Sequence, residues 1–392
     1  MGFFRRNSEI MFFIYSICLM LLAGLPVWMF YRNLKLFLPA TSDSKLLEQA
    51  SFEKISILIP ARNEAASIGA AIDCVLENRA IHFELLILDD QSEDDTAATI
   101  RQRIATPQPN SKIRLIESIP LPAGWNGKQH ACWRLAEAAQ FDWLLFLDAD
   151  VRLSEDAIQR LVAESLRTQV SLLSGFPYQE TGSIAEKMLI PLMHYILLGY
   201  LPIHQLRTST SPQFSAGCGQ LMLARRDAYF ACDGHRSIRA SRHDGIQLPR
   251  AFRLKGLTTD VFDASDIATC RMYRNRREVV QGLLKNASEG IANPKLIFVF
   301  TVLLIGASVL PIPSLIFAWR TEQSRLTMTL LLIASLCVFI PRLLAAARFR
   351  QSLLGTILHP AAVVWFLGLQ WLAWIRSMRG IRVAWRGRYL LL

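Results

Sequence analysis

The stretch Leu144-Leu-Phe-Leu-Asp148-Ala149-Asp150 decides the fold. Four large apolar residues in a row indicate a strand that is buried on both faces, as strands of parallel sheets are. Two carboxylates follow directly, so the chain delivers both to one edge of the sheet. Hard oxygen ligands at this spacing suit Mg²⁺ or Mn²⁺ bridging a diphosphate. A lone pair of this kind is common, and its weight depends on what the rest of the sheet brings to the same edge.

Three further β-rich runs precede this strand, and stretches compatible with helices separate them. The predicted strands are Ile55–Pro60, Glu84–Asp89, Ile113–Glu117 and Trp143–Asp148, and the predicted helices are Glu64–Glu77, Asp94–Ile104, Lys128–Gln140 and Ser154–Leu166. Strands that alternate with helices are typical of βαβ units. The fold class is therefore α/β, with a mostly parallel, buried sheet.

Two of the earlier strands also end in polar residues. The stretch Ile57-Leu-Ile-Pro-Ala-Arg-Asn-Glu64 delivers its charged end to the carboxyl edge of the sheet, where open α/β sheets bind ligands. Its alternative reading is a strand followed by a charged helix N-terminus. In Leu88-Asp89-Asp90, the two acids stand where a carboxylate can accept a base N–H or a ribose hydroxyl. The acids at 94 and 95 instead suit the first turn of a helix.

The composition indicates a soluble domain joined to membrane segments. Of 392 residues, 52% are hydrophobic and only 19% charged, and the mean hydropathy is +0.27. The apolar excess lies in discrete runs. The first, residues 9–31, is long enough to cross a bilayer and has no small-residue cleavage site, so residues 1–35 are interpreted as a transmembrane anchor.

The net charge of +11 does not indicate a nucleic-acid partner. No Lys/Arg block is interleaved with aromatic residues, and the arginines gather beside the apolar runs, where they suit lipid headgroups and topology signals. None of the seven cysteines forms a C-x-x-C pair, which favours free thiols in a reducing compartment over disulfides or zinc.

Taken together, the motifs resemble glycosyltransferase family 2, whose members have the GT-A fold, a nucleotide-sugar-binding, Rossmann-like sheet. The matching motifs are P-A-R-N-E, D-D-Q-S-E-D-D-T, G-W-N-G-K and F-L-D-A-D, in the family's order and spacing. Within the family, the chain is similar to membrane-bound enzymes that glycosylate carotenoid, hopanoid or related polyisoprenoid lipids. That likeness rests on Leu121–Lys128, Ala216–Gln220, Cys270–Tyr273 and Trp385–Tyr389.

The resemblance implies a donor site. Glu64 and Asp90 would contact the nucleoside, Asp148 would face ribose or metal, and Asp150 would coordinate Mg²⁺ or Mn²⁺ on the diphosphate. The metal would offset charge that develops on the leaving nucleoside diphosphate. Lys128, in a glycine-flanked loop, is either a phosphate contact or a solvated lysine.

The resemblance also implies a base for the acceptor, from an acidic Glu-Asp pair before a helix. Here Arg242-His243-Asp244-Gly245 occupies that place, so Asp244 matches the base and His243 replaces the usual Glu. His243 can hydrogen-bond Asp244 or the acceptor, or merely pack. We interpret Gly217-Cys-Gly219 as a close-approach loop that lines the acceptor site.

The family's Q/R-x-x-R-W motif is absent in that form. Arg274 and Arg277 stand in its place; they would share a helix face if this stretch is helical, and either clamp phosphate or lie at the membrane surface. Trp385 can supply a comparable group if the C-terminal tail is cytoplasmic. The missing Trp argues against a processive polysaccharide synthase.

The expected organisation is a cytoplasmic GT-A domain over residues 51–290, with an apolar interfacial segment at about 188–203. Residues 293–375 hold apolar runs at 295–319, 326–347 and 352–375, and residues 376–392 form a tail with five arginines. The positive-inside bias favours an even number of C-terminal crossings, with the remaining run re-entrant or interfacial. We therefore expect an integral protein of the cytoplasmic membrane whose catalytic domain faces the cytoplasm.

The expected function is an inverting, metal-dependent transfer of one sugar from a UDP-sugar to a membrane lipid. Two alternatives stand beside it: transfer to a polyprenyl phosphate, and a non-catalytic membrane scaffold. The sequence identifies neither the sugar, the lipid nor the oligomeric state.

Overall fold

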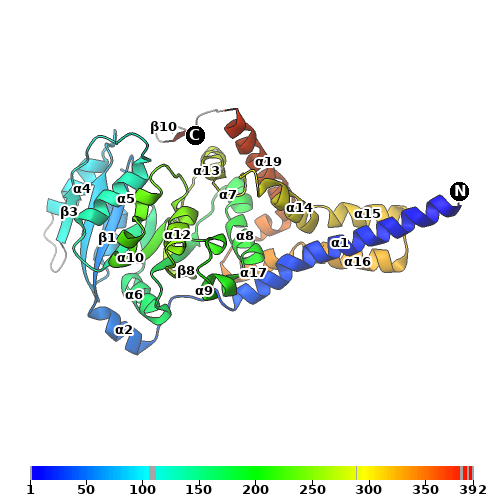
Figure 1. The fold of residues 1–392 in the computed structure, drawn as a ribbon, viewed down its shortest axis with the longest axis horizontal. Helices are drawn as coiled ribbons and strands as arrows, with labels where there is room; N and C mark the ends of the chain where they lie inside the picture. Colours follow the sequence, from blue (N-terminus) through cyan, green and yellow to red (C-terminus); the bar gives the residue numbers. More distant parts are fainter. Residues whose placement is uncertain (1, 106–111, 288, 380–382, 386–387, 391–392) are drawn as a thin grey trace.

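The computed structural model describes the whole chain except residues 1, 106–111, 288, 380–382, 386–387 and 391–392. It has two parts, an α/β domain and a group of long helices that projects away from it (Figure 1). Short helices of residues 184–208 and the helix of residues 276–287 lie between the two parts.

One eight-stranded sheet forms the centre of the α/β domain, in the order β3-β2-β1-β4-β7-β6-β8-β5. Its strands are β1 (Lys54–Ala61), β2 (His82–Asp89), β3 (Lys112–Ile116), β4 (Trp143–Leu147), β5 (Val151–Leu153), β6 (Leu172–Gln179), β7 (Leu221–Arg225) and β8 (Thr259–Cys270). Strands β1 to β4 run parallel, as the alternating pattern predicted. Strand β7 is antiparallel to both β4 and β6, and β5 is antiparallel to β8.

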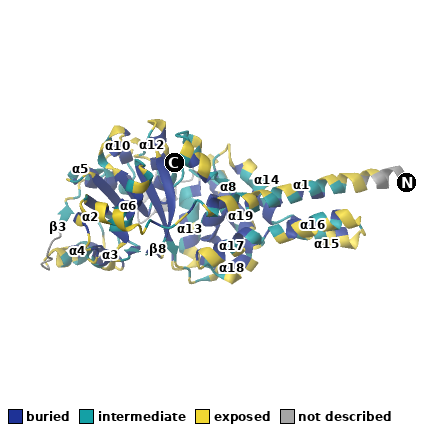
Figure 2. Ribbon diagram, turned by 90° about the horizontal axis from the view of Figure 1, so that it is seen from below, coloured by how far each residue is buried: buried dark blue, intermediate teal, exposed yellow. Residues whose placement is uncertain are grey.

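Helices cover both faces of the sheet. They are α2 (Ser44–Ser51), α3 (Ile68–Leu76), α4 (Thr96–Ala105), α5 (Gly127–Ala138), α6 (Ala157–Thr168), α10 (Arg226–Ala231), α11 (Gly234–Ser237) and α12 (Asp244–Leu254), with a 3-10 turn at Pro212–Phe214. Alternate residues of a strand face opposite sides of a sheet. Accordingly Ile57 packs with α3 and α6 on one face, whereas Leu58 packs with α5 and α12 on the other. Figure 2 shows these strands as the most buried part of the molecule.

The second half of the sheet is mixed rather than parallel, and strand β8 is its least expected member. Its sequence carries three aspartates, which break the apolar pattern of a buried strand. Each has an arginine partner elsewhere in the fold: Asp260 pairs with Arg207, Asp263 with Arg348 and Asp266 with Arg160. Asp260 and Asp263 are buried, and buried acids are tolerated in a strand when they are paired in this way, whereas Asp266 is exposed.

The predicted interfacial segment, residues 188–203, is a chain of short helices and not a continuous span. It comprises parts of α7 (Ile184–Leu189), α8 (Leu192–Tyr200) and α9 (Ile203–Thr208). Pro191 and Pro202 directly precede α8 and α9. Proline has no N–H to continue the preceding helix, so each of them separates two short helices. Helix α8 and α13 (Arg276–Ala287) pack with the C-terminal helices in one apolar cluster.

The N-terminal helix α1 (Gly2–Leu34) joins this segment through one side chain. Asn33 is buried, and its amide nitrogen donates to the carbonyl oxygens of Leu198 and Leu201 at 2.8 and 2.6 Å. Its amide oxygen accepts from the N–H of Ile203 at 3.2 Å. These bonds satisfy the backbone groups that the break between α8 and α9 leaves open.

Within the residues that the structure describes, three helical segments are long and apolar enough to cross a membrane: Glu9–Leu34, Arg325–Arg348 and His359–Met378. They correspond to α1, to α16 (Arg325–Cys337) followed by α17 (Ile340–Arg348), and to α19 (His359–Met378). A further pair, α14 (Ile297–Ser308) and α15 (Pro311–Arg320), qualifies only as a unit and is bent by 51°. A short helix, α18 (Leu353–Ile357), precedes α19.

Helices α1, α15 and α16 project together, with the N-terminus at the far end from the α/β domain (Figure 1). Leu19 of α1 packs with Ala318 and Leu331 of the other two. Their outward faces expose large apolar side chains such as Met11 and Trp319, which suits contact with lipid (Figure 2).

Helix α19 follows a segment that already lies at the α/β domain, because Arg348 at the end of α17 pairs with Asp263 of β8. Near its end, Ala373 packs with Ala287 and Ala292, which flank the turn after α13. The C-terminal end therefore lies on the side of the α/β domain, opposite the turn between α15 and α16 (Figure 1). This is the arrangement expected for an even number of C-terminal crossings; the number itself stays a prediction.

Candidate active site

The two aspartates that follow β4 occupy a tight turn at the middle of the sheet. The N–H of Asp148 donates to the carbonyl oxygen of Gln220 at 3.0 Å, and the N–H of Val151 donates back to the carbonyl of Asp148 at 3.1 Å. Strand β5 begins directly after Asp150. Both carboxylates are half-buried and stand at the carboxyl end of the parallel strands, the edge at which open α/β sheets bind ligands.

Lys128 lies between the donor-side aspartate and the proposed base. Its Nζ is 2.7 Å from Oδ1 of Asp148 and 2.8 Å from Oδ2 of Asp244, and it donates to the carbonyl oxygen of Gly219 at 3.2 Å. The residue stands in the first turn of α5, whose N-terminus Asn126 caps by accepting from the N–H of Lys128. The ammonium group of Lys128 is thus ion-paired rather than free in solvent, while its contact with phosphate stays a prediction.

Burial makes the charges of this trio interdependent. Burial lowers the pKa of Lys128, but Asp148 and Asp244 outweigh it and hold that pKa well above its ordinary value. For Asp244 burial acts to raise the pKa, yet the ammonium group of Lys128 holds it below the usual carboxyl range. Burial and the nearby Asp150 and Asp244 raise the pKa of Asp148 to about 6 against the opposing effect of Lys128. Asp244 is thus the ionised carboxylate and Asp148 the one with a raised pKa.

Glycines make room for Asp244. This residue opens α12, and its Oδ1 accepts from the N–H of Gly245 at 2.9 Å. A Cβ placed on Gly219 would come within 2.2 Å of Asp244 Oδ1, and one on Gly245 within 2.7 Å of the carbonyl oxygen of Gly217. The Gly217-Cys-Gly219 stretch is therefore a close-approach loop, as predicted, and it packs directly against the proposed base.

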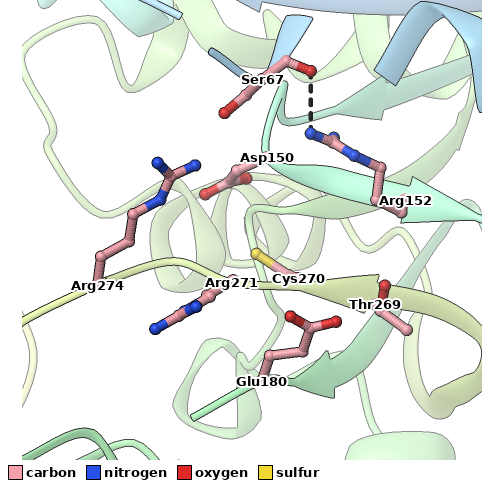
Figure 3. Close-up of a pocket in the computed structure, with 8 residues that line it drawn as sticks. All are labelled: Ser67, Asp150, Arg152, Glu180, Thr269, Cys270, Arg271 and Arg274. Carbon is pink, nitrogen blue, oxygen red and sulfur yellow. Dashed lines mark hydrogen bonds between the residues drawn. The ribbon is translucent and has the colours of Figure 1, made fainter. Parts of the chain in front are cut away.

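A pocket of about 280 Å³ opens beside Asp150. Figure 3 shows the carboxylate of Asp150 and the guanidinium group of Arg274 pointing into it. Its walls are formed by Ser67, Asp150, Arg152, Glu180, Thr269, Cys270, Arg271 and Arg274. Arg152 is largely occupied by structure, because it donates to the carbonyl oxygens of Ala149, Val151 and Ser67. Arg271 and Arg274 are exposed cations at the rim of the pocket.

Arg274 and Arg277 do not share a helix face. Arg274 lies in the bend before α13, where its N–H donates to Oε2 of Glu278 at 2.7 Å, whereas Arg277 lies within the helix. Of the two, only Arg274 lines the pocket. Arg276, between them, stacks over the ring of Trp365 in α19 at 5.3 Å.

Asp148 and Asp150 fit a divalent cation only together with a phosphorylated ligand. Within the described part of the chain, no group of three or more His, Cys, Asp or Glu side chains is arranged to hold a metal ion. Magnesium sites, however, commonly take one or two carboxylates and complete the shell with substrate phosphates and water. The aspartate pair and the adjacent pocket are consistent with that kind of site.

The loops after β1 and β2 bring Glu64 and Asp90 to the same edge. Asp90 is 5% exposed, its N–H donates to the carbonyl of Ala61 at 2.8 Å, and its own carbonyl accepts from Arg62 at 2.6 Å. The N–H of Glu64 donates to the hydroxyl of Thr96 at 2.8 Å. The neighbouring Asp89 is engaged within its turn by the hydroxyl of Ser92.

The structure describes the surroundings of His243 but only the backbone of Trp385. His243 immediately precedes α12, and burial lowers the pKa of its imidazole while Asp244 and Glu289 act to raise it. Trp385 ends a short strand, β9 (Val383–Trp385), that pairs with β10 (Arg388–Leu390), and its side chain lies outside the described residues. Sequence reasoning missed Glu289, 45 positions after Asp244, because no local pattern relates the two.

Comparison with known proteins agrees with this geometry. Residues 56–230 match the family described as glycosyl transferase family 2. The chain is 26% identical over 343 residues to 4,4'-diaponeurosporenoate glycosyltransferase of Staphylococcus aureus strain USA300, covering 85% of this chain and 87% of that protein. The same enzyme of strain MRSA252 matches equally.

Among solved structures, the chain resembles the mannosyltransferase PcManGT from Pyrobaculum calidifontis in complex with GDP-Man and Mn²⁺. The TM-score is 0.53 at 15% identity, covering 94% of this chain and 99% of that one. At this identity the likeness concerns the fold, an α/β domain of the GT-A type joined to apolar helices. The family match over residues 56–230 and the similarity to the Staphylococcus aureus enzymes support a glycosyltransferase of the family 2 type, and the solved structure supports the fold.

Proposed function

We propose that this enzyme transfers a single sugar from a nucleotide-sugar, a UDP-sugar, to a membrane lipid of the carotenoid, hopanoid or other polyisoprenoid class, with inversion at the sugar carbon. The observation that carries the proposal is the ion-paired trio of Asp148, Lys128 and Asp244. It joins a donor-side carboxylate to a candidate base within one buried site, in a domain that packs on apolar helices.

The pocket beside Asp150 is the proposed place of the donor diphosphate. Arg271 and Arg274 offer guanidinium groups to phosphate oxygens, and Asp90 and Glu64 lie toward the nucleoside end of the same sheet edge. A bound Mg²⁺ or Mn²⁺ would be held by Asp150 and Asp148, and would offset charge on the leaving nucleoside diphosphate.

Asp244 is the proposed catalytic base. As the acceptor hydroxyl attacks the sugar carbon, its proton passes to the Asp244 carboxylate, the new glycosidic bond forms and the bond to the diphosphate breaks. One base and a direct displacement invert the configuration. If the acceptor is a protonated carboxylic acid, its proton passes to Asp244 in the same way; an acceptor that is already ionised attacks through its own carboxylate without a base. The ionised state that Lys128 imposes on Asp244 supports the role of base.

The architecture supports a lipid acceptor. The 188–203 segment packs against α13, α14 and α19, so the α/β domain meets the apolar helices at their near ends. The Staphylococcus aureus relative is a glycosyltransferase of 4,4'-diaponeurosporenoate, a carotenoid acid. We infer that the lipid enters sideways, between the 188–203 segment and the C-terminal helices.

We further propose that the protein lies in the cytoplasmic membrane, with its α/β domain and the basic 376–392 tail in the cytoplasm. The nucleotide-sugar is made there, and the five arginines of the tail follow the positive-inside bias. The C-terminal end of α19 lies on the side of the α/β domain, which supports this orientation (Figure 1).

Two other readings are less well supported. A polyprenyl phosphate acceptor needs little help from a base, as an ionised carboxylate does, so Asp244 favours an acceptor that still carries a proton, a hydroxyl or a protonated acid, over the phosphate. A scaffold has no need to bury an ion-paired trio, because burying charges costs free energy that a purely structural site avoids with apolar residues.

The deciding experiment incubates the purified protein with UDP-glucose, UDP-galactose, UDP-N-acetylglucosamine or GDP-mannose, with Mg²⁺ or Mn²⁺ and a bacterial lipid extract. We expect metal-dependent release of UDP together with a lipid heavier by one sugar in mass spectrometry. Asp150→Asn is the matched negative control. A product that is a sugar ester of polyprenyl phosphate selects the second reading, and no release with any donor and lipid selects the scaffold.

A further inference from the structure

Glu289 reaches the segment that carries Asp244 from a distant part of the chain. It lies in the turn after α13, and its side chain is 20% exposed. Its Oε1 accepts from the backbone N–H of Arg242 at 2.7 Å, and its Oε2 accepts from the hydroxyl of Ser241. The guanidinium group of Arg242 adds an ion pair at 3.8 Å. One carboxylate therefore engages two consecutive residues just before the base.

The bonds continue from Glu289 to the start of α12. The hydroxyl of Ser241, which donates to Glu289, also accepts from the N–H of His243 at 3.0 Å. The carbonyl of Ser241 accepts from the side chain of Gln129 in α5 at 3.3 Å. Residues 241–243 are thereby fixed on two sides, and Asp244 follows immediately. A carboxylate that accepts several N–H and O–H hydrogen bonds holds its partners firmly, because hydrogen bonds to a charged group are stronger than those between neutral groups.

The turn that carries Glu289 packs against α19, one of the apolar C-terminal helices. Ala287 precedes Glu289 by two residues and packs with Ala292 and with Ala373 of α19. The N–H groups of Gly290 and Ala292 both donate to the carbonyl of Ala287 at 3.0 Å, so the turn is itself well formed. The location of Glu289 thus depends on the docking of α13 against α19.

We propose that Glu289 is a positioning residue for the base: it holds residues 241–243 so that Asp244 stands beside Lys128, and it ties that placement to the packing of α13 on α19. It supplies to this segment the second carboxylate that the sequence lacks at position 243, where the family pattern has Glu and this chain has His243. The inference rests on the proposed role of Asp244.

The test compares Glu289→Ala, Glu289→Gln and Ser241→Ala in the full-length protein. For Glu289→Ala we expect kcat to fall by about 10- to 100-fold, since small displacements of a catalytic group cost this much. The KM for the UDP-sugar should stay within about 2-fold, because the donor pocket is formed by other residues. Glu289→Gln keeps an acceptor oxygen for one of its two partners and should recover part of the rate.

The coupling itself is tested by the double variant. If Glu289 acts through Ser241, then Ser241→Ala in the Glu289→Ala background should change kcat little, although it lowers kcat in the wild type. Asp73→Ala is the matched control, because Asp73 also accepts two hydrogen bonds, from Arg103 at 2.7 and 2.9 Å, but on the surface away from the site. It should leave kcat unchanged.

Hydrogen exchange separates this inference from the proposed function, because it needs no acceptor. Glu289→Ala should raise exchange in residues 239–248 and leave strands β1 to β4 as protected as before. A kcat within 2-fold of wild type, or equal losses of kcat and donor affinity, overturns the proposal. Should Glu289→Ala not fold, Glu289→Gln and Ser241→Ala decide it by the same criteria. If the wild type transfers no sugar, the proposed function fails while the exchange result still stands.

Discussion

The side-chain nitrogen of Lys128 lies 2.8 Å from Oδ2 of Asp244, so that an ion pair joins the start of α5 to the start of α12. The same nitrogen is 2.7 Å from Asp148, which follows β4. A single cation is therefore shared between the donor side and the acceptor side of the site. Any ligand that takes Lys128 or Asp148 for its own phosphate or metal changes the charge that Asp244 experiences.

Replacing Lys128 should move the pH dependence of the reaction. Burial acts to raise the pKa of Asp244, and Lys128 holds it below its ordinary value. In Lys128→Gln the opposing effect is gone, the pKa rises, and the acid limb of the kcat/KM profile should shift to higher pH. Lys128→Arg keeps the charge and should keep the limb. An acid limb that is identical in Lys128→Gln and wild type would contradict the assignment.

Asp244→Asn should separate binding from turnover. The substitution keeps the shape of the side chain but removes the proton acceptor, so we expect turnover to fall about 10²- to 10⁴-fold. Binding of UDP, measured by calorimetry, should be nearly unchanged, because Asp244 does not line the donor pocket. Near-normal turnover would exclude Asp244 as the base.

Asp148→Asn should trade activity for stability. The raised pKa of Asp148, about 6 against an ordinary 3.8, means that the native state binds this proton more tightly than the unfolded state does. Stability therefore falls as the pH rises from the lower pKa to the higher one, and at neutral pH the ionised carboxylate destabilises the protein. In EDTA at neutral pH, Asp148→Asn should raise Tm by about 2–4 °C, with little gain near pH 4, below the native pKa. A Tm gain of equal size at both pH values would refute this explanation.

Gly219→Ala should inactivate the enzyme without touching the donor pocket. The new Cβ would lie 2.2 Å from Asp244 Oδ1, so the base must move. We expect a loss of kcat of about 10²-fold or more, as for a catalytic group displaced by about 1 Å. Gly368→Ala in α19 is the control, since a Cβ there meets nothing within 4 Å. If the two variants are equally active, the contact between Gly219 and the base is unimportant.

The orientation of the helices can be checked by labelling single cysteines. After replacement of the native cysteines, a cysteine at Glu322 in the turn after α15 should react with a membrane-impermeant maleimide added to intact cells. One at Arg379, just after α19, should react only once the membrane is opened. Labelling of position 379 in intact cells would exclude a cytoplasmic tail and an even number of C-terminal crossings.

The first half of the sheet, strands β1 to β4, could be predicted because each strand has a local sequence pattern. Strands β1, β2 and β4 are mostly apolar and β3 alternates apolar with charged residues, and the observed bounds of β4, Trp143–Leu147, differ from the predicted run by one residue. The second half could not be predicted, because its strands depend on partners that are distant in the sequence. Strand β8 contains three aspartates whose arginine partners lie between 53 and 106 positions away, so the sequence of β8 alone does not resemble that of a buried strand.

The site divides in the same way. The acids at strand ends, and Asp244 before a helix, were predictable from spacing and from the family resemblance. The position of Lys128 could not be predicted, because only the folded chain brings the start of α5 next to both Asp148 after β4 and Asp244 in α12. Arg274 and Arg277 would share a helix face only if both were helical, and the helix begins at Arg276, two residues after Arg274, because Glu278 caps the preceding bend. Helix boundaries of this kind depend on side-chain hydrogen bonds that periodicity does not register.

The buried amide of Asn33 changes what the N-terminal helix does. A helix joined to a domain by a flexible linker leaves the domain free to reorient relative to the bilayer. Here three hydrogen bonds connect α1 to the break between α8 and α9, so α1 and the α/β domain are rigidly connected. Such a connection sets both the tilt and the height of the catalytic face relative to the lipid. If the acceptor is a membrane lipid, as proposed, the depth of its reactive end in the bilayer then decides whether it reaches the site.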